Sequence, residues 1–237
     1  MGGVFRLIYV KICWTHCTRI SLRKWEGLSM DSKSVRFLEW AREIQALAQT
    51  ENHYAKDDFS RERCRRLMEI AAAMIGEIAG IDSQALTNAF NSQIGYATPK
   101  IDVRAAVFRD RKLLLVRERI DGGWTMPGGW ADVGDAPSKA AEREVWEEAG
   151  FHVKARKLIG VYDANRMNPM EVFHAFKIVF LCEIVDGEAR TSSETSEVAF
   201  FGADEMPEKF SGERTTARHV ADAFAAFRNP EWPTIFD

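Results

Sequence analysis

The sequence predicts an α/β protein in which a small all-helical domain precedes a domain built on a mixed sheet. Two observations carry this prediction. Between residues 31 and 90, apolar residues recur every three or four positions, which is the spacing of one face of an amphipathic helix. All seven prolines and most of the sixteen glycines follow residue 98, where strand-like apolar runs begin. This change in composition separates a helical domain, residues 30–95, from an α/β domain, residues 96–237.

Residues 1–29 differ from the rest of the chain in charge. They contain five basic residues and one acid, a net charge of +4, whereas the whole chain of 237 residues carries −3. We interpret them as a leader that is either disordered or not part of the native protein, because Met30 directly precedes the first helix signal. A secretory signal is disfavoured, because Arg6 and Lys11 interrupt the apolar stretch and no A-x-A-like cleavage site follows.

Composition excludes several classes of function. The net charge of −3 and the pI of about 6.0 provide no global basic field, so we expect no nucleic-acid partner. Four cysteines are too few for a disulfide scaffold in a chain of this length. No uncharged apolar run approaches the roughly 18 residues of a membrane span. We therefore expect a cytoplasmic protein without membrane contact.

Three helices are expected in the helical domain. The first carries one apolar face, formed by Phe37, Trp40, Ala41, Ile44, Leu47 and Ala48. A polar stretch at residues 50–57 breaks this pattern, and Asp58 or Ser60 caps a second helix that ends at Gly80. Asp82 caps a third, shorter helix. Three helices of this size form a marginal core alone, so we expect them to pack on the rest of the chain or on a second copy.

Strands and two further helices are expected in the α/β domain. Five strand-like runs lie at residues 103–108, 113–117, 153–162, 172–182 and 198–201. The turn Arg109–Lys112 joins the first two runs into a hairpin. A glycine-dense loop covers residues 122–134, and a helix starts near Pro137, because proline suits the first helical position. A last helix covers about residues 213–228.

The segment over residues 128–151 has the composition of a metal site. On a helix, with about 100° between successive residues, Glu144, Glu147 and Glu148 fall within one sector. Like-charged side chains at this spacing on a helix repel one another. One interpretation is a solvated acidic face. The other, which we favour, is a site for Mg²⁺ or Mn²⁺, because hard carboxylate oxygens suit these ions and phosphate oxygens can complete the shell.

This segment resembles the Nudix box, G-x5-E-x7-R-E-U-x-E-E-x-G-U, in which U is a bulky apolar residue. The matching positions are Gly129, Arg143, Glu144, Val145, Glu147, Glu148, Gly150 and Phe151. One position departs from the box, because its first glutamate is Asp135 here. Aspartate keeps the charge and shortens the reach by one methylene, so we expect altered loop packing or metal affinity rather than lost activity. The resemblance implies a Nudix α/β/α sandwich with a mixed sheet.

The resemblance also implies roles for the residues of the box. Glu144 and Glu148, one turn apart, would be the principal metal ligands, with Glu147 as a supplement. The loop at Gly128 and Gly129 would give a backbone carbonyl to the metal, because glycine lets the backbone approach closely. Arg143 would orient the glutamates.

A further acid often serves as ligand or base in this family, and it comes from a loop before a late strand. Here Glu197 is the preferred candidate and Glu194 the alternative. The implied reaction is Mg²⁺-dependent hydrolysis of a diphosphate bond, in which water attacks phosphorus and a carboxylate takes its proton.

Flanking motifs narrow the resemblance to bacterial ADP-ribose and CDP-choline pyrophosphatases with a helical N-terminal domain. These motifs lie at Tyr96–Arg104, Leu114–Glu118 and Asp121–Pro127. The implied substrate is a nucleoside diphosphate linked to another moiety, which would yield a nucleoside monophosphate and a phosphorylated product. In such a protein the N-terminal helices would build a homodimer interface or cover the substrate cleft.

Four further residues are candidate substrate contacts. Arg104 and Arg117 could hold phosphate as bidentate donors. Asp163 and Arg166 could touch the ribose or the leaving group. Two other functions remain open at this point: a Nudix-fold regulator that senses a nucleotide without hydrolysis, and a Nudix enzyme that acts on RNA ends.

Overall fold

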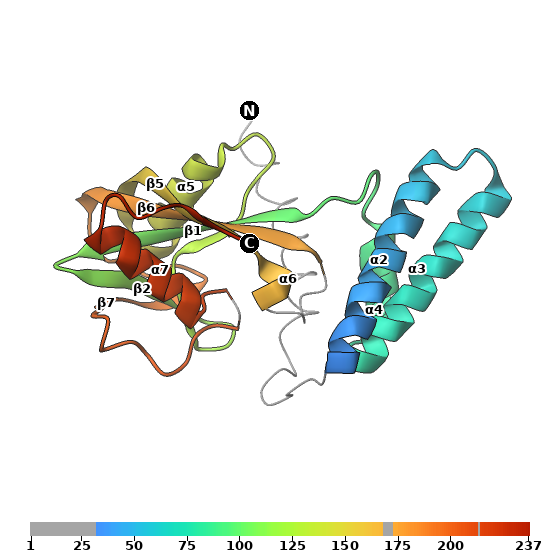
Figure 1. The fold of residues 1–237 in the computed structure, drawn as a ribbon, viewed down its shortest axis with the longest axis horizontal. Helices are drawn as coiled ribbons and strands as arrows, with labels where there is room; N and C mark the ends of the chain where they lie inside the picture. The colour runs from blue at the N-terminus through green and yellow to red at the C-terminus, as the bar shows by residue number, and fades with distance from the viewer. Residues whose placement is uncertain (1–31, 168–172, 213) are drawn as a thin grey trace. The chain divides into compact units, whose positions relative to one another are not determined.

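A computed structural model describes residues 32–167, 173–212 and 214–237 (Figure 1). The predictions for residues 1–29 therefore lie outside the described residues. Contacts divide the chain into two units. The first unit contains the described residues up to Pro99, together with Phe173 and His174. The second unit contains Lys100–Met167 and the described residues of Ala175–Asp237. Each unit has its own hydrophobic core.

The first unit is helical. It consists of α2 (Ser32–Tyr54), α3 (Asp58–Ala79) and α4 (Ser83–Asn91). Its core comes from all three helices and contains Leu38, Ala41, Ala48, Met68, Ala72, Ile75, Ala79, Leu86 and Phe90. The first predicted helix was expected to end near residue 50, but α2 continues to Tyr54. Among the described residues, no helix combines the length and apolarity needed to cross a membrane.

Short polar side chains and a glycine set the ends of these helices. The predicted cap of the second helix, Asp58 or Ser60, was wrong. The residue that caps α3 is Asp57, one position before Asp58. The Asp57 carboxylate accepts a hydrogen bond from the Ser60 backbone N–H at 2.8 Å, and the Asp57 backbone is extended, as an N-cap requires. Gly80 ends α3 in the left-handed conformation, with φ 63°, and Asp82 caps α4; both were predicted.

The second unit is built on a mixed sheet of eight strands within the described residues. The strands are β1 (Lys100–Arg109), β2 (Lys112–Glu118), β3 (Trp124–Thr125), β4 (Gly128–Trp130), β5 (Phe151–Asp163), β6 (Ala175–Gly187), β7 (Thr195–Phe201) and β8 (Ile235–Phe236). Their order is β3-β2-β1-β6-β5-β8, with β4 beside β1 and β7 beside β2. The pairs β1–β6 and β5–β8 are parallel, and the other pairs are antiparallel.

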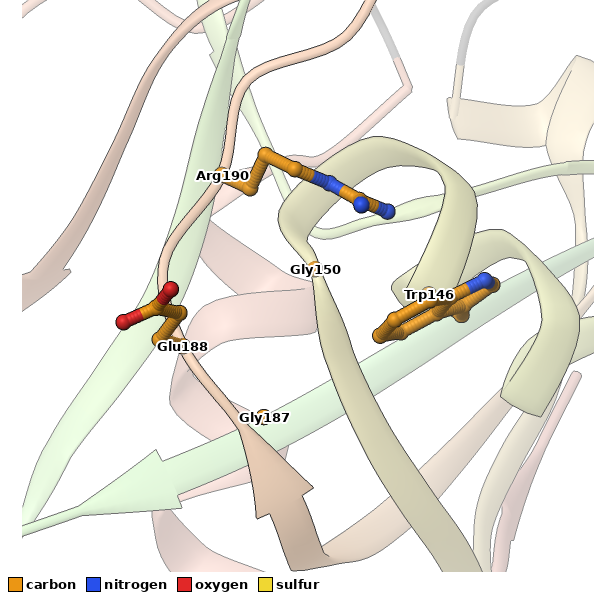
Figure 2. Close-up of a pocket in the computed structure, with 5 residues that line it drawn as sticks. All are labelled: Trp146, Gly150, Gly187, Glu188 and Arg190. Carbon is orange, nitrogen blue, oxygen red and sulfur yellow. The ribbon is translucent and has the colours of Figure 1, made fainter.

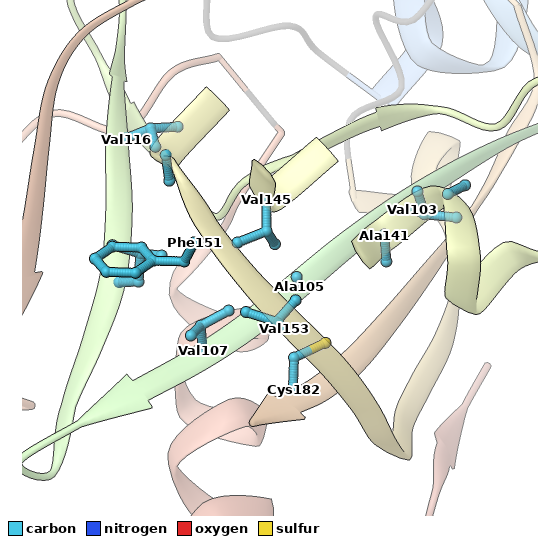
Figure 3. Close-up of a cluster of buried hydrophobic side chains, with 12 residues drawn as sticks. Val103, Ala105, Val107, Val116, Ala141, Val145, Phe151, Val153 and Cys182 are labelled. Atoms are coloured by element: carbon cyan, nitrogen blue, oxygen red, sulfur yellow. The ribbon is translucent and has the colours of Figure 1, made fainter. Parts of the chain in front are cut away.

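Helices cover both faces of this sheet. On one face, α5 (Pro137–Ala149) packs on a core that includes Val103, Ala105, Val107, Val116 and Phe151 (Figure 3). On the other face, α7 (Ala217–Arg228) packs on a core that includes Ala106, Leu113, Leu115, Ile159 and Val179. A short helix, α6 (Ala164–Met167), follows β5. The unit is therefore the predicted α/β/α sandwich with a mixed sheet.

The predicted elements of the second unit differ from the observed ones mainly at their ends. The hairpin at Arg109 and Lys112 is confirmed, because these residues pair and the two between them have φ of 50° and 63°, as a type I′ turn requires. The fourth predicted strand begins at Ala175 rather than at residue 172. The last helix begins at Ala217 because Thr216 caps it. The strands β3, β4 and β8 were not predicted, since two or three residues carry no periodicity.

Candidate active site

The apolar residues of α5 determine which way its acids face. Four of them are fully buried against the sheet: Ala140, Ala141, Val145 and Ala149. Glu144 and Glu148, one turn apart, then lie beside the glycine pair at the start of β4. The Gly128 backbone N–H donates to Glu148 Oε2 at 3.0 Å, and a Cβ on Gly129 would lie 3.3 Å from Glu144 Oε2. Gly150 ends the helix in the left-handed conformation, with φ 78°.

Arg143 connects the loop before α5 to the acids of the helix. Its Nη1 lies 2.8 Å from Glu144 Oε1 and 3.0 Å from Glu147 Oε2. Its Nε lies 3.4 Å from Asp135 Oδ2, and its Nη2 lies 3.6 Å from Asp132 Oδ2. The aspartate at the position that departs from the box thus still reaches Arg143. One guanidinium fixes acids from both segments, which is the arrangement needed to orient the glutamates.

The pKa values of the two inner glutamates are raised, because burial outweighs the effect of the nearby arginines. Burial raises the pKa of Glu144 to about 7, and Glu147 adds to the increase although Arg143 opposes it. Burial also raises the pKa of Glu148 well above its usual range, with the charges of Glu144 and Glu118 adding to the effect. Crowded, buried carboxylates of this kind are stabilised by a cation. The donor chemistry therefore fits a divalent ion with a preference for oxygen ligands.

The arrangement is not a closed metal cage. In the part of the chain that the structure describes, no group of three or more His, Cys, Asp or Glu side chains is arranged to hold a metal ion. The reason lies in the contacts of the glutamates: Glu144 and Glu147 face Arg143, whereas Glu148 faces Gly128. The assignment of Glu144, Glu147 and Glu148 as metal ligands stays a prediction.

Arg104, a predicted phosphate contact, is almost completely buried, with 2% of its surface exposed. Its guanidinium forms two hydrogen bonds of 2.9 Å with Asp102, and its Nη1 donates to the Met126 carbonyl at 3.2 Å. Lys177 lies 3.3 Å from the same carboxylate. Although burial opposes it, Arg104 and Lys177 hold the pKa of Asp102 at about 2. The guanidinium is thus engaged in a buried ion pair, and its predicted phosphate contact stays a prediction.

Two other predicted site residues meet on neighbouring strands. Arg117 on β2 is paired with Glu197 on β7, and Arg117 Nη1 lies 2.5 Å from Glu197 Oε1. Glu197 was expected in the loop before the strand, but it is the third residue of β7. Glu194 does precede β7, and its carbonyl accepts a hydrogen bond from the Arg119 N–H at 2.8 Å. The choice between Glu197 and Glu194 as the further acid stays a prediction.

Asp163 and Arg166 form a pair of their own at the end of β5 and in α6. Asp163 Oδ1 accepts a hydrogen bond from the Asn165 N–H at 2.9 Å, and Asp163 Oδ2 lies 3.7 Å from Arg166 Nε. The Arg166 side chain is largely exposed. Their predicted contact with the ribose or leaving group stays a prediction.

Sequence reasoning missed several polar residues around this site. Asp102 carried a signal, because it lies two residues before Arg104 and alternate residues share one face of a strand. Glu118 and Arg214, which lie 3.5 Å apart, carried none, because they are distant in the sequence. Thr195 was also missed: its hydroxyl donates to the Glu148 carbonyl at 2.8 Å and ties the start of β7 to the end of α5.

A surface hollow lies elsewhere on α5. It is lined by Trp146, Gly150, Gly187, Glu188 and Arg190 (Figure 2). The Arg190 guanidinium lies over the Trp146 indole, 4.6 Å from its centroid. Around the axis of α5, Trp146 points about 160° away from Glu144 and Glu148. The hollow is therefore separate from the site beside Gly128 and Gly129.

Family models match both parts of the chain. The model described as "NUDIX domain" matches residues 98–223, and the chain belongs to this family. A second model, described as "UDP-X-like, N-terminal oligomerisation domain", matches residues 36–90.

Relatives of known name agree with this assignment. The Bacillus subtilis (strain 168) protein named "Putative ADP-ribose pyrophosphatase YjhB" is 36% identical over 203 residues, which cover 85% of this chain and 97% of that protein. An ADP-ribose pyrophosphatase structure from Streptococcus suis 89-1591 has a TM-score of 0.54 and 38% identity, covering 59% of this chain and all of that one. A UDP-X diphosphatase structure has a TM-score of 0.56 and 29% identity, covering 86% and 99%. The chain is therefore a hydrolase of the pyrophosphatase type.

Proposed function

We propose that this protein is a divalent-metal-dependent pyrophosphohydrolase that cleaves the diphosphate bond of a nucleoside diphosphate linked to a second moiety. The products are a nucleoside monophosphate and the phosphorylated second moiety. The observation that carries the proposal is the pair Glu144 and Glu148, one largely buried and one buried carboxylate, which lie one turn apart beside a glycine pair. The relatives named as ADP-ribose pyrophosphatases and a UDP-X diphosphatase support this substrate class. CDP-choline remains a predicted substrate of the same class.

Glu144 and Glu148 would hold the metal, Mg²⁺ or Mn²⁺, with Glu147 as a supplement and a backbone carbonyl from the glycine pair Gly128–Gly129. When bound, the metal would neutralise the diphosphate and make an attacking water more acidic. Arg143 would keep Glu144 and Glu147 oriented through its contacts with both.

A carboxylate outside α5 would accept the proton of the attacking water. We assign this role to Glu197, with Glu194 as the alternative. The contact with Arg117 supports Glu197, because a paired guanidinium fixes the direction of the carboxylate. Arg117 itself is about half-exposed, so it can also reach a phosphate. Asp163 and Arg166 would contact the ribose or the leaving group.

We further propose that the protein is a cytoplasmic homodimer and that α2 and α3 form its interface. Both helices expose large apolar side chains that the core of their own unit does not use: Phe37, Trp40, Leu47, Tyr54, Phe59, Leu67 and Ile70. On α2 the exposed residues are spaced by three and seven positions, which is the spacing of a helix-packing seam. The match of this region to an oligomerisation domain supports the proposal.

The proposal is tested with a panel of ADP-ribose, a UDP-sugar and CDP-choline. Each compound is incubated with the full chain and Mg²⁺ or Mn²⁺, and the products are separated by chromatography and identified by mass. We expect release of a nucleoside monophosphate from at least one compound, and none when EDTA removes the metal. Release of inorganic phosphate alone, or no metal-dependent release from any compound, would contradict the proposal.

A further inference from the structure

Glu118 is a buried acid that the proposed reaction does not use. It is the last residue of β2 and is 4% exposed. Its charge adds to the unfavourable field at Glu148 and to the favourable field at Arg104. A carboxylate buried beside another carboxylate is costly unless a cation accompanies it. Arg214 is the cation that reaches it, with Nη1 3.5 Å from Glu118 Oε2.

The chain before α7 is fixed to the connection between β2 and β3, and this fixes Arg214. The Ser211 N–H donates to the Trp124 carbonyl at 2.8 Å, and a Cβ on Gly123 would lie 2.5 Å from the Ser211 backbone. The Ser211 hydroxyl donates to Asp121 Oδ2 at 2.9 Å and accepts from Arg214 Nη1 at 2.8 Å. Arg214 is thus held by a residue that is itself completely buried.

Arg214 keeps hydrogen-bonding capacity that Arg104 and Arg143 have largely used. A guanidinium has five N–H donors in a planar fork. Both contacts of Arg214 use Nη1, so its Nε and Nη2 have no partner among the described residues. The side chain is 19% exposed, so solutes can reach it. Arg104, by contrast, is buried and bound to Asp102, and Arg143 faces four carboxylates.

We propose that Arg214 is a substrate-binding residue, which donates its Nε and Nη2 hydrogens to a phosphate group of the nucleoside diphosphate while Glu118 and Ser211 hold Nη1. Parallel donation from one edge of a guanidinium is the geometry that suits phosphate oxygens. Arg214 then has a phosphate-binding role of the kind that the sequence predicted for Arg104 and Arg117. The inference rests on the proposed function, because it requires a substrate located at Glu144 and Glu148.

Two variants of Arg214 and one control test this role. Arg214→Gln removes the charge and the fork, and Arg214→Lys keeps the charge alone. The control is Arg156→Gln, since Arg156 on β5 is an exposed arginine paired with one carboxylate, Glu183, at 2.7 Å. For each full-length protein, KM and kcat are measured on the best substrate of the panel. The Kd for ADP with Mg²⁺ is measured by calorimetry, and circular dichroism checks the fold.

We expect Arg214→Gln to raise KM and the ADP Kd by about tenfold or more, because charge-assisted hydrogen bonds to phosphate are lost. Arg214→Lys should raise KM and the ADP Kd by a smaller factor, and Arg156→Gln should have the wild-type values. KM and Kd within twofold of wild type in a folded Arg214→Gln protein would overturn the inference while leaving the proposed function intact. Arginine-dependent ADP binding without turnover of any panel compound would overturn the proposed function instead. Absence of ADP binding by the wild type would overturn the inference.

Discussion

The Glu148 carboxylate accepts a hydrogen bond from the Gly128 backbone N–H at 3.0 Å, and Glu148 is only 6% exposed. This contact joins the start of β4 to the last turn of α5. Two other features explain why the glycine cannot change. Gly128 has φ 148°, and a Cβ there would lie 2.0 Å from the Val103 carbonyl. The loop and the acids of the helix therefore form one rigid arrangement.

Gly128→Ala should unfold the second unit or destabilise it by about 3 kcal/mol or more, because strain and a backbone clash act together. The matched control is Gly134→Ala. Gly134 also has a positive φ, 101°, but a Cβ there meets nothing within 4 Å, so we expect a cost of about 1 kcal/mol. Urea unfolding of both variants measures the difference. Equal stability of the two variants would show that the contact with Val103 does not constrain the loop.

Arg143→Lys should lower kcat about 10- to 100-fold, because a point charge cannot contact acids of the loop and the helix as the guanidinium does. The loss should be accompanied by a higher Mg²⁺ concentration for half-maximal activity. Steady-state kinetics across a Mg²⁺ titration provide both values. Arg156→Lys serves as the control and should behave as wild type, and an unchanged kcat in Arg143→Lys would remove its orienting role.

His219 makes stability depend on pH. Burial, together with Lys177, lowers the pKa of the fully buried His219 to about 3, although Asp102 opposes this. Its Nδ1 accepts a hydrogen bond from the Thr216 N–H at 3.1 Å, so the ring is neutral. The unfolded chain, with a pKa of about 6.5, binds this proton first as pH falls. The contribution of His219 to stability is therefore complete above about pH 6.5 and decreases towards pH 3.

The measurement is the free energy of unfolding between pH 4.5 and 7.5. Relative to His219→Gln, the wild type should lose stability as pH decreases through this range, because the raised pKa values of Glu144 and Glu148 act in the opposite direction equally in both proteins. His152→Gln, at an exposed histidine of β5, is the control and should leave the slope unchanged. A slope in His219→Gln identical to wild type would assign the pH dependence to other groups.

Leu47→Glu should convert the proposed homodimer into a monomer. Leu47 is 65% exposed on α2, so the charge harms no packing within its own unit, whereas it would be buried in an interface. Light scattering after size-exclusion chromatography gives the mass. Glu39→Lys, at another exposed position of α2, is the control and should remain a dimer. A wild-type monomer, or a dimer of unchanged affinity in Leu47→Glu, would refute this interface.

The sequence predicted the features that depend on short-range patterns. Glu144 and Glu148 could be placed together because one helix fixes their separation, and Gly80 and Asp82 were recognised because helix ends select these residues. The match to the Nudix box then indicated the protein family. These features require no knowledge of which strands are neighbours.

Features that depend on tertiary contacts could not be predicted. The burial of Arg104 and its pairing with Asp102 are one example, because a position on a strand gives no information on burial. Arg214 and Glu118 meet only because the chain before α7 packs against the connection after β2. The one-residue error at Asp57 has a different cause, since two adjacent aspartates are both suitable caps and only the backbone conformation selects one.

The central claim is that the buried glutamates of α5 carry metal-dependent hydrolysis, and Glu148→Gln tests it most directly. The measurement is metal-dependent release of nucleoside monophosphate by this variant, compared with the wild type and with Glu188→Gln, an exposed glutamate on the surface hollow. We expect a loss of several orders of magnitude in Glu148→Gln at unchanged or higher Tm, because the substitution removes a charge buried beside like charges. Glu188→Gln should retain wild-type activity. Near-normal turnover by a folded Glu148→Gln protein would contradict the account.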